Sequence, residues 1–161
     1  MDRERLKNIP VMYLYATSDG YMWLSYRSIL AKYDINGQLV KEYPLRNKYG
    51  RTTISGFCES RNHEIIISVW NGRVYHLDKE KDEFVPYPDK MRRQNPTVMV
   101  QDNEQDYFWL ATWGDGVVRF DPSAPEDSMF VYSEIPVNAA GEEDGVIPVS
   151  YTHLRAHETS E

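Results

Sequence analysis

Two tryptophans beside glycine turns are the side chains in this sequence best suited to contact a ligand. Trp70 and Trp113 lie 43 residues apart, and Asn-Gly or Gly-Asp-Gly follows each of them. A tryptophan at the end of a strand offers an apolar face and a polar edge to a polyhydroxylated molecule. Packing between repeated units is an equally open role for these tryptophans. For the nearby arginines, Arg73 and Arg119, solvated roles or hydrogen bonds between units are favoured over ligand binding. The candidate ligand-binding residues are Trp70, Asn71, Arg73, Trp113, Asp115 and Arg119.

The other residues that could do chemistry have structural explanations. The run 102–106, DNEQD, has the composition of a calcium loop but lacks the glycine and distal glutamate of an EF-hand, which favours a solvated hairpin turn. Asp34, Asp78 and Asp121 recur in register at expected strand ends, where an aspartate caps the following turn. Cys58 has no base paired with it, which favours a small buried hydrophobe. The sequence therefore predicts no catalytic residue, no metal site and no cofactor.

The C-terminal residues contain a pattern that imitates a metal site. His153 and His157 are four residues apart, a spacing that could place two imidazoles on one metal if the segment were helical, but no third ligand follows. The run 149–159, VSYTHLRAHET, resembles one reading frame of a sequencing adapter translated by read-through. We therefore interpret residues 149–161 as a non-native tail and exclude them from the predicted domain, 1–148.

Composition narrows the class of protein. Aromatic residues make up 13% of the 161 residues, which favours β-strands. The formal net charge of −7 argues against nucleic acid as a partner and against an anionic membrane surface. A single cysteine excludes an internal disulfide. Neither an apolar run of membrane-spanning length nor the apolar region of a signal peptide is found in the sequence.

A repeat of about 43 residues organises the chain. Trp23, Ile66 and Trp109 fall at intervals of 43, and the next residues, all leucine or isoleucine, keep the same spacing. Each unit contains a short apolar strand, a polar turn, a very apolar strand, a second turn, an alternating strand that ends on aspartate, and an outer strand. No segment keeps a helical period, so helix should be minimal.

Four short antiparallel strands in each unit are typical of a β-propeller blade. The sequence predicts an all-β fold, a partial β-propeller of about three four-stranded antiparallel blades at 10–45, 54–88 and 96–136. Because propellers need about 4–8 blades to close, we expect an open array with an exposed apolar face at each end.

The segment Trp109–Pro122, WLATWGDGVVRFDP, resembles the two-component regulator propeller repeat. The first unit is similar at Asp19–Leu24 but lacks the glycine pair, and the second has Ile66 in place of the tryptophan. The resemblance covers residues 10 to 136. It implies the periplasmic sensing part of a hybrid histidine kinase, membrane-anchored and dimeric, that recognises an oligosaccharide or other small molecule. It also implies that further blades neighbour these three.

Two other functional classes stay open on the sequence. One is a propeller scaffold for protein–protein interaction, and the other is a fragment of a propeller lyase or hydrolase. An enzyme should carry non-repeating His, Asp or Glu residues at one rim, and none stands out in the sequence, which also holds no kinase motif. The leading hypothesis is therefore a binding module without enzymatic activity of its own.

Overall fold

The computed structural model describes residues 3–91 and 95–132, and this part of the chain is built almost entirely of β-strands. Twelve of these strands form three four-stranded antiparallel sheets, in which each strand pairs with its neighbour in sequence. This confirms the predicted all-β fold with four-stranded antiparallel units. The predicted boundary at residue 148, the tail at 149–161 and the pair His153 and His157 all lie outside the described residues.

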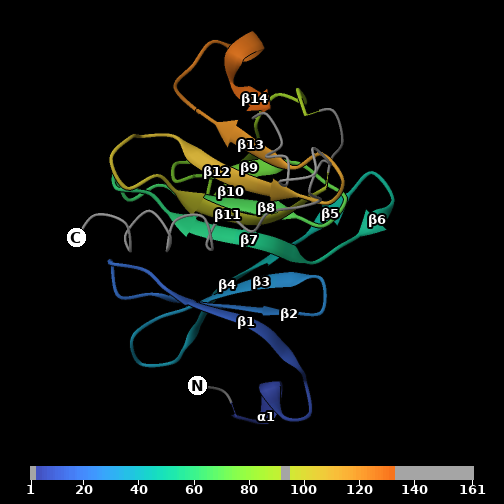
Figure 1. Ribbon diagram of the computed structural model, residues 1–161. Helices are drawn as coiled ribbons and strands as arrows, with labels where there is room; N and C mark the ends of the chain where they lie inside the picture. Colours follow the sequence, from blue (N-terminus) through green and yellow to red (C-terminus); the bar gives the residue numbers. More distant parts are fainter. Residues whose placement is uncertain (1–2, 92–94, 133–161) are drawn as a thin grey trace, which may run out of the picture.

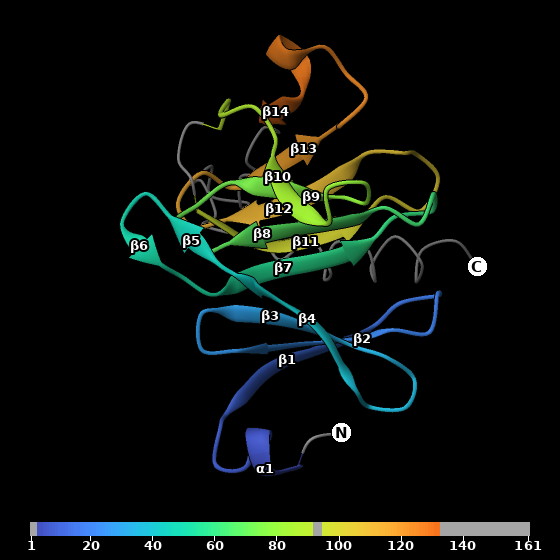
Figure 2. The same cartoon turned by 180° about the vertical axis from the view of Figure 1, so that it is seen from behind.

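We number the sheets as blades in chain order (Figures 1 and 2). Blade 1 contains β1 (Val11–Ala16), β2 (Met22–Tyr26), β3 (Ile29–Tyr33) and β4 (Leu39–Pro44). Blade 2 contains β7 (Ile54–Glu59), β8 (Ile65–Val69), β9 (Val74–Asp78) and β10 (Glu83–Pro86). Blade 3 contains β11 (Pro96–Gln101), β12 (Phe108–Thr112), β13 (Val117–Phe120) and β14 (Phe130–Tyr132). The only helical turns in the described part are α1 (Arg3–Leu6) and η1 (Glu126–Ser128).

The apolar core lies between the blades. Successive residues of a strand point to opposite faces of its sheet, so the second strand of each blade contributes to two interfaces. In β8, Ile66 packs in the cluster shared with blade 3, whereas Ile67 packs in the cluster shared with blade 1. Trp23 of blade 1 is 1% exposed and packs in that same cluster between blades 1 and 2. The run-like hydrophobicity of these strands therefore reflects burial on both faces.

The N-terminal segment covers the end of the array at blade 1. On the far side of blade 1, Leu24 and Tyr33 are buried, and Leu6 and Ile9 of the N-terminal segment pack against them. The predicted exposed apolar face at this end is therefore wrong, because the segment that precedes β1 covers it (Figure 1). The apolar exposure of blade 1 lies along β1 instead, in a run of consecutive residues, Val11, Met12, Tyr13 and Leu14.

Aspartates close the turns as the sequence predicts. Asp34 Oδ1 accepts hydrogen bonds from the backbone N–H groups of Asn36 and Gln38, each at 2.9 Å. The carboxylates of Asp78 and Asp121 accept in the same way within their own turns. Asp102 does so in the turn at 102–107, which confirms a hairpin turn there. These aspartates have a structural role within their own turns. Each one accepts from backbone N–H groups that have no partner on a neighbouring strand where the chain reverses.

A small additional hairpin joins blades 1 and 2. It consists of β5 (Arg46–Asn47) and β6 (Gly50–Arg51), paired antiparallel. No element is predicted there from the sequence, because two-residue strands of polar residues carry no hydrophobic alternation. Figure 2 shows this hairpin projecting beside blade 2, at the same side as the turn that follows β8.

Candidate functional site

The turns of the blades gather at two opposite rims because antiparallel strands reverse at each turn. We call one the tryptophan rim: it holds the turns between second and third strands, at 27–28, 70–73 and 113–116, and the connections between blades. We call the other the aspartate rim: it holds the turns between first and second strands and those between third and fourth strands. The predicted tryptophans, Trp70 and Trp113, both lie at the tryptophan rim, at the ends of β8 and β12.

Trp113 presents an exposed indole on a fixed backbone. The residue as a whole is 72% exposed to solvent. Its backbone N–H donates to the carbonyl oxygen of Asn95 at 3.0 Å, and its own carbonyl accepts from Nδ2 of Asn95. Within the turn, Asp115 N–H donates to Oγ1 of Thr112 at 3.2 Å. Because the backbone is held in this way, a ligand can bind to the exposed ring with little loss of backbone entropy.

Trp70 is held by the corresponding contacts in blade 2. Its N–H donates to the carbonyl oxygen of Thr53 at 3.0 Å. Its carbonyl oxygen accepts from Nδ2 of Asn47 at 2.8 Å and from Oγ1 of Thr52 at 2.9 Å. The next residue, Asn71, is exposed and has a φ of 47°, the left-handed conformation that this turn requires. Trp70 itself is half-buried, so it offers less surface to a ligand than Trp113 does.

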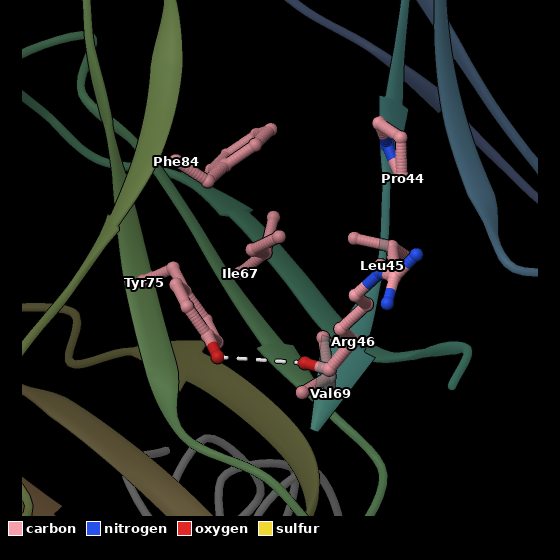
Figure 3. Close-up of a pocket in the computed structure, with 7 residues that line it drawn as sticks. All are labelled: Pro44, Leu45, Arg46, Ile67, Val69, Tyr75 and Phe84. Atoms are coloured by element: carbon pink, nitrogen blue, oxygen red, sulfur yellow. Dashed lines mark hydrogen bonds between the residues drawn. The ribbon is translucent and has the colours of Figure 1, made fainter. Parts of the chain in front are cut away.

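A cavity of about 300 Å³ lies between blades 1 and 2, beneath the connection that leads to the β5–β6 hairpin (Figure 3). Ile67, Val69 and Phe84 form its apolar wall. Tyr75 donates its hydroxyl hydrogen to the carbonyl oxygen of Arg46 at 3.5 Å across the opening. An apolar cavity with a few polar groups at its edge has the general character of a ligand pocket, at the lower end of the usual size range.

The two predicted arginines do not join the tryptophans. Arg73 directs Nη2 to the carbonyl oxygen of Tyr87, a contact within blade 2 and its following connection. The Arg119 guanidinium lies 5.3 Å from the centre of the Tyr107 ring, on the side of blade 3 away from blade 2. The structure therefore places Trp70, Asn71 and Arg73 in one turn, and Trp113 and Asp115 in the corresponding turn of blade 3. The Arg73 guanidinium is engaged by Tyr87, and Arg119 lies away from both tryptophans.

A polar cluster that the sequence analysis misses joins blades 1 and 2 at the aspartate rim. Ser18 Oγ donates to a carboxylate oxygen of Glu59 and lies 2.9 Å from Nδ1 of His63. His63 Nδ1 is also 3.2 Å from Oε1 of Glu59. Because the hydroxyl and the carboxylate contact the same ring nitrogen, the histidine does not stand between them as a proton relay. The arrangement joins neighbouring blades, and no sequence signal finds it because Ser18 is 41 residues from Glu59 and 45 residues from His63.

Metal binding, thiol chemistry and membrane insertion find little support in the part of the chain that the structure describes. No group of three or more His, Cys, Asp and Glu side chains is placed there to hold a metal ion. Burial raises the pKa of the Cys58 thiol to about 11, so at neutral pH the thiol stays protonated. Among the same residues, no helix is long and apolar enough to span a membrane.

Comparison with known proteins relates this chain to propeller-type structures. It is 21% identical to virginiamycin B lyase of Staphylococcus aureus, with a TM-score of 0.62 over 81% of this chain and 43% of that one. It is 14% identical to the extracellular domain of a putative hybrid two-component system of Bacteroides thetaiotaomicron, with a TM-score of 0.54 over 74% and 18% of the two chains. An auxiliary nutrient binding protein of the same species gives 15% identity and a TM-score of 0.55 over 70% and 28%.

No family model matches the sequence, and no curated protein matches it. The chain spans less than half the length of each of these three structures, which extend beyond the region matched. At such low identity the likeness concerns the fold alone. The described residues are thus three antiparallel blades of an all-β, partial β-propeller.

Proposed function

We propose that this chain is part of an extracytoplasmic β-propeller that recognises a small ligand, with carbohydrate as the ligand class. The observation that carries the proposal is that Trp113, at the end of β12, is 72% exposed to solvent. Stacking against an aromatic ring suits a sugar, because a sugar ring has an apolar face and a polar edge. The hydrogen bonds around Trp113 fix its backbone, so a ligand can stack on the ring without a change in the turn.

The Trp70 turn supports the same proposal. The exposed Asn71 amide beside Trp70 supplies a donor and an acceptor suited to hydroxyl groups. The apolar cavity of about 300 Å³ lies between blades 1 and 2. It is near the β5–β6 hairpin, from which Nδ2 of Asn47 donates to the Trp70 carbonyl oxygen. In the whole protein, the tryptophan rims of several blades would together offer a larger surface than this chain does.

The role in signalling rests on likeness of fold and on the repeat motif. The chain resembles in fold the extracellular domain of a putative hybrid two-component system. We propose a parent protein that is membrane-anchored and dimeric, with the propeller in the periplasm and neighbouring blades completing the ring. The likeness in fold to an auxiliary nutrient binding protein also favours ligand recognition.

A lyase is the second candidate, because virginiamycin B lyase has a similar fold. The polar cluster of Ser18, Glu59 and His63 is the arrangement closest to a catalytic one in the described part of the chain. Its shared contact at Nδ1 of the histidine favours a structural role. We therefore propose a binding module and not an enzyme. A scaffold for protein–protein contacts is the remaining alternative, and ligand titration separates it from the binding module.

The proposal is tested by titrating the chain with neutral oligosaccharides and following heat release and tryptophan fluorescence. We expect binding that Trp113→Ala removes and Trp113→Phe partly retains, since a phenyl ring still provides a stacking face. The matched control is Ile35→Ala, which shortens an 86% exposed apolar residue at the aspartate rim. If no oligosaccharide binds, or if Trp113→Ala binds as the unchanged chain does, the tryptophan rim is not a sugar site.

A further inference from the structure

The cavity of about 300 Å³ between blades 1 and 2 has an apolar wall and a cationic edge. Ile67 and Val69, which line it, are each 1% exposed. Tyr75 and Phe84 also line it but are only half-buried, so their rings keep apolar surface open to a ligand. Figure 3 shows these two rings on one side of the cavity and Arg46 on the other. A cavity of this volume suits a ligand whose body is about as large as an aromatic ring.

Arg46, at the edge of the cavity, is paired with a second arginine. Arg46 and Arg51 lie directly opposite each other on β5 and β6, and both are exposed. Opposite residues of an antiparallel pair place their side chains on the same face, where two like charges repel each other. Within the described residues, neither guanidinium forms an ion pair with a carboxylate. A bound anion would therefore relieve this repulsion and form a charge-assisted hydrogen bond.

The positive charge at the cavity is not offset by its lining. None of the described residues that line the cavity is acidic. Burial raises the pKa of the Tyr75 hydroxyl, and the charge that acts on this hydroxyl is that of Arg73, which opposes the rise. The Arg73 guanidinium donates to the carbonyl oxygen of Tyr87, a neutral partner that leaves its charge in place. In a chain of net charge −7, this cavity is thus a local region of positive potential.

We propose that this cavity binds a small molecule that has an apolar body and one carboxylate. The carboxylate would lie against Arg46, and the body would pack on Tyr75 and Phe84. A planar guanidinium matches a carboxylate with two parallel hydrogen bonds, and the nearby apolar wall strengthens them by excluding water. This ligand differs from the sugar proposed for Trp113, and neither proposal depends on the other.

NMR titration of the whole chain with sugar-free probes tests the site. Phenylacetate and phenylacetamide share a shape and differ in charge, and acetate supplies the carboxylate without the ring. We expect phenylacetate to shift the methyl signals of Ile67 and Val69 but not the indole N–H signal of Trp113. Phenylacetamide should bind at least roughly tenfold more weakly, because it lacks the charge that strengthens the hydrogen bond to Arg46. Acetate should also bind more weakly, and added salt should weaken the binding of phenylacetate.

Substitutions on the β5–β6 hairpin test the role of Arg46. Arg46→Gln should lower the affinity for phenylacetate by roughly tenfold or more, to about that of phenylacetamide. Arg46→Lys should retain part of the affinity, since an ammonium keeps the charge but not the planar pair of donors. Lys48→Gln is the matched control, because it removes the same charge from an exposed residue of the same hairpin that does not line the cavity. This variant should bind phenylacetate as the unchanged chain does.

The proposal is overturned if phenylacetate leaves the Ile67 and Val69 signals in place, or if phenylacetamide or acetate binds as tightly. Unchanged binding by Arg46→Gln overturns it as well. Loss of phenylacetate binding in Trp113→Ala would place the probe at the sugar site and also refute the cavity site. Arg46 is exposed and its substitution removes no core contact, and the comparison of phenylacetate with phenylacetamide needs no variant.

Discussion

The backbone N–H of Ser18 donates to Oε2 of Glu59 at 2.8 Å, joining the first turn of blade 1 to the first strand of blade 2. The same contact recurs one blade later, where Arg61 N–H donates to Oε1 of Gln101 at 2.9 Å. In both cases the last residue of a first strand accepts a turn N–H of the preceding blade. These side chains satisfy the N–H donors of the turns. They also fix the alignment of neighbouring blades, because hydrogen bonds are directional and apolar packing between sheets is not.

Replacing Glu59 by alanine should loosen the junction of blades 1 and 2. The side chain accepts from the backbone and hydroxyl of Ser18 and contacts His63, so its loss leaves turn donors without a partner. We expect a decrease of about 1–3 kcal/mol in the free energy of unfolding, measured by chemical denaturation. Glu104→Ala, in an exposed turn of blade 3, is the control and should change stability little. Equal effects of the two substitutions would contradict a role for Glu59 in blade alignment.

The same carboxylate should make stability depend on acid pH. Desolvation acts to raise the pKa of Glu59, but the hydrogen bonds from Ser18 and the contact with His63 outweigh it and lower the pKa below 4.5. A lowered pKa in the folded state adds stability above the ordinary pKa, and this stability is lost as the pH falls through the folded value. Unfolding free energies measured from neutral pH to about pH 3 should therefore fall less steeply for Glu59→Gln. Parallel profiles for the two proteins would show that Glu59 is not linked to folding.

Gly56 should tolerate no side chain, because β7 and β11 approach closely there. A Cβ at this position would lie 2.7 Å from Oγ of Ser68 and 3.2 Å from Cβ of Met99. We expect Gly56→Ala to destabilise the chain by about 1–3 kcal/mol, through overpacking at the junction of blades 2 and 3. Gly20→Ala is the comparison, since open space surrounds its Cβ and only its φ of 87° opposes a side chain. Thermal unfolding should rank Gly56→Ala as the more damaging change; the reverse order would refute the close approach.

Tyr43 and Asp82 form a second contact between blades 1 and 2. The hydrogen bond from the Tyr43 hydroxyl is the main cause of the lowered pKa of Asp82, with Lys41 adding to it. Tyr43→Phe should therefore raise the pKa of Asp82, followed by NMR titration of its carboxyl group, and should cost about 0.5–1.5 kcal/mol of stability at neutral pH. Tyr21→Phe removes a hydroxyl from another tyrosine that packs against the same core cluster, and it serves as the control. An unchanged pKa of Asp82 in Tyr43→Phe would argue against the contact in solution.

Trp23 and Trp109 occupy the same position in blades 1 and 3 but should respond differently to truncation. Trp23 is 1% exposed and contacts Phe57 and Phe84 of blade 2, at ring distances of 5.8 and 6.3 Å. Trp109 is half-buried, on the side of blade 3 away from blade 2. Trp23→Ala should cost about 3–5 kcal/mol and Trp109→Ala clearly less, measured by denaturant unfolding. Equal costs would mean that another part of the chain packs on Trp109 as closely as blade 2 packs on Trp23.

Much of the fold and part of the candidate site could be predicted from local sequence. The interval from Trp23 to Ile66 to Trp109 marks the second strands, because each must bury both faces between neighbouring blades. Asp34 and Asp78 mark turns because an aspartate bonds to backbone N–H groups two to four residues later. The same local rules place Trp70 and Trp113 beside their turns. The polar β5–β6 hairpin escapes prediction because its short strands bury no alternating face.

The sequence by itself determined the all-β class, the repeat and the local turn chemistry, since these depend on residues close together in the chain. Only the tertiary structure decided which equivalent residues differ in burial, as Trp23 and Trp109 do, because burial depends on whether another blade covers a face. It also decided which turns meet. Ser18 and Glu59 are 41 residues apart, and only the stacking of one blade on the next brings the donor to its acceptor.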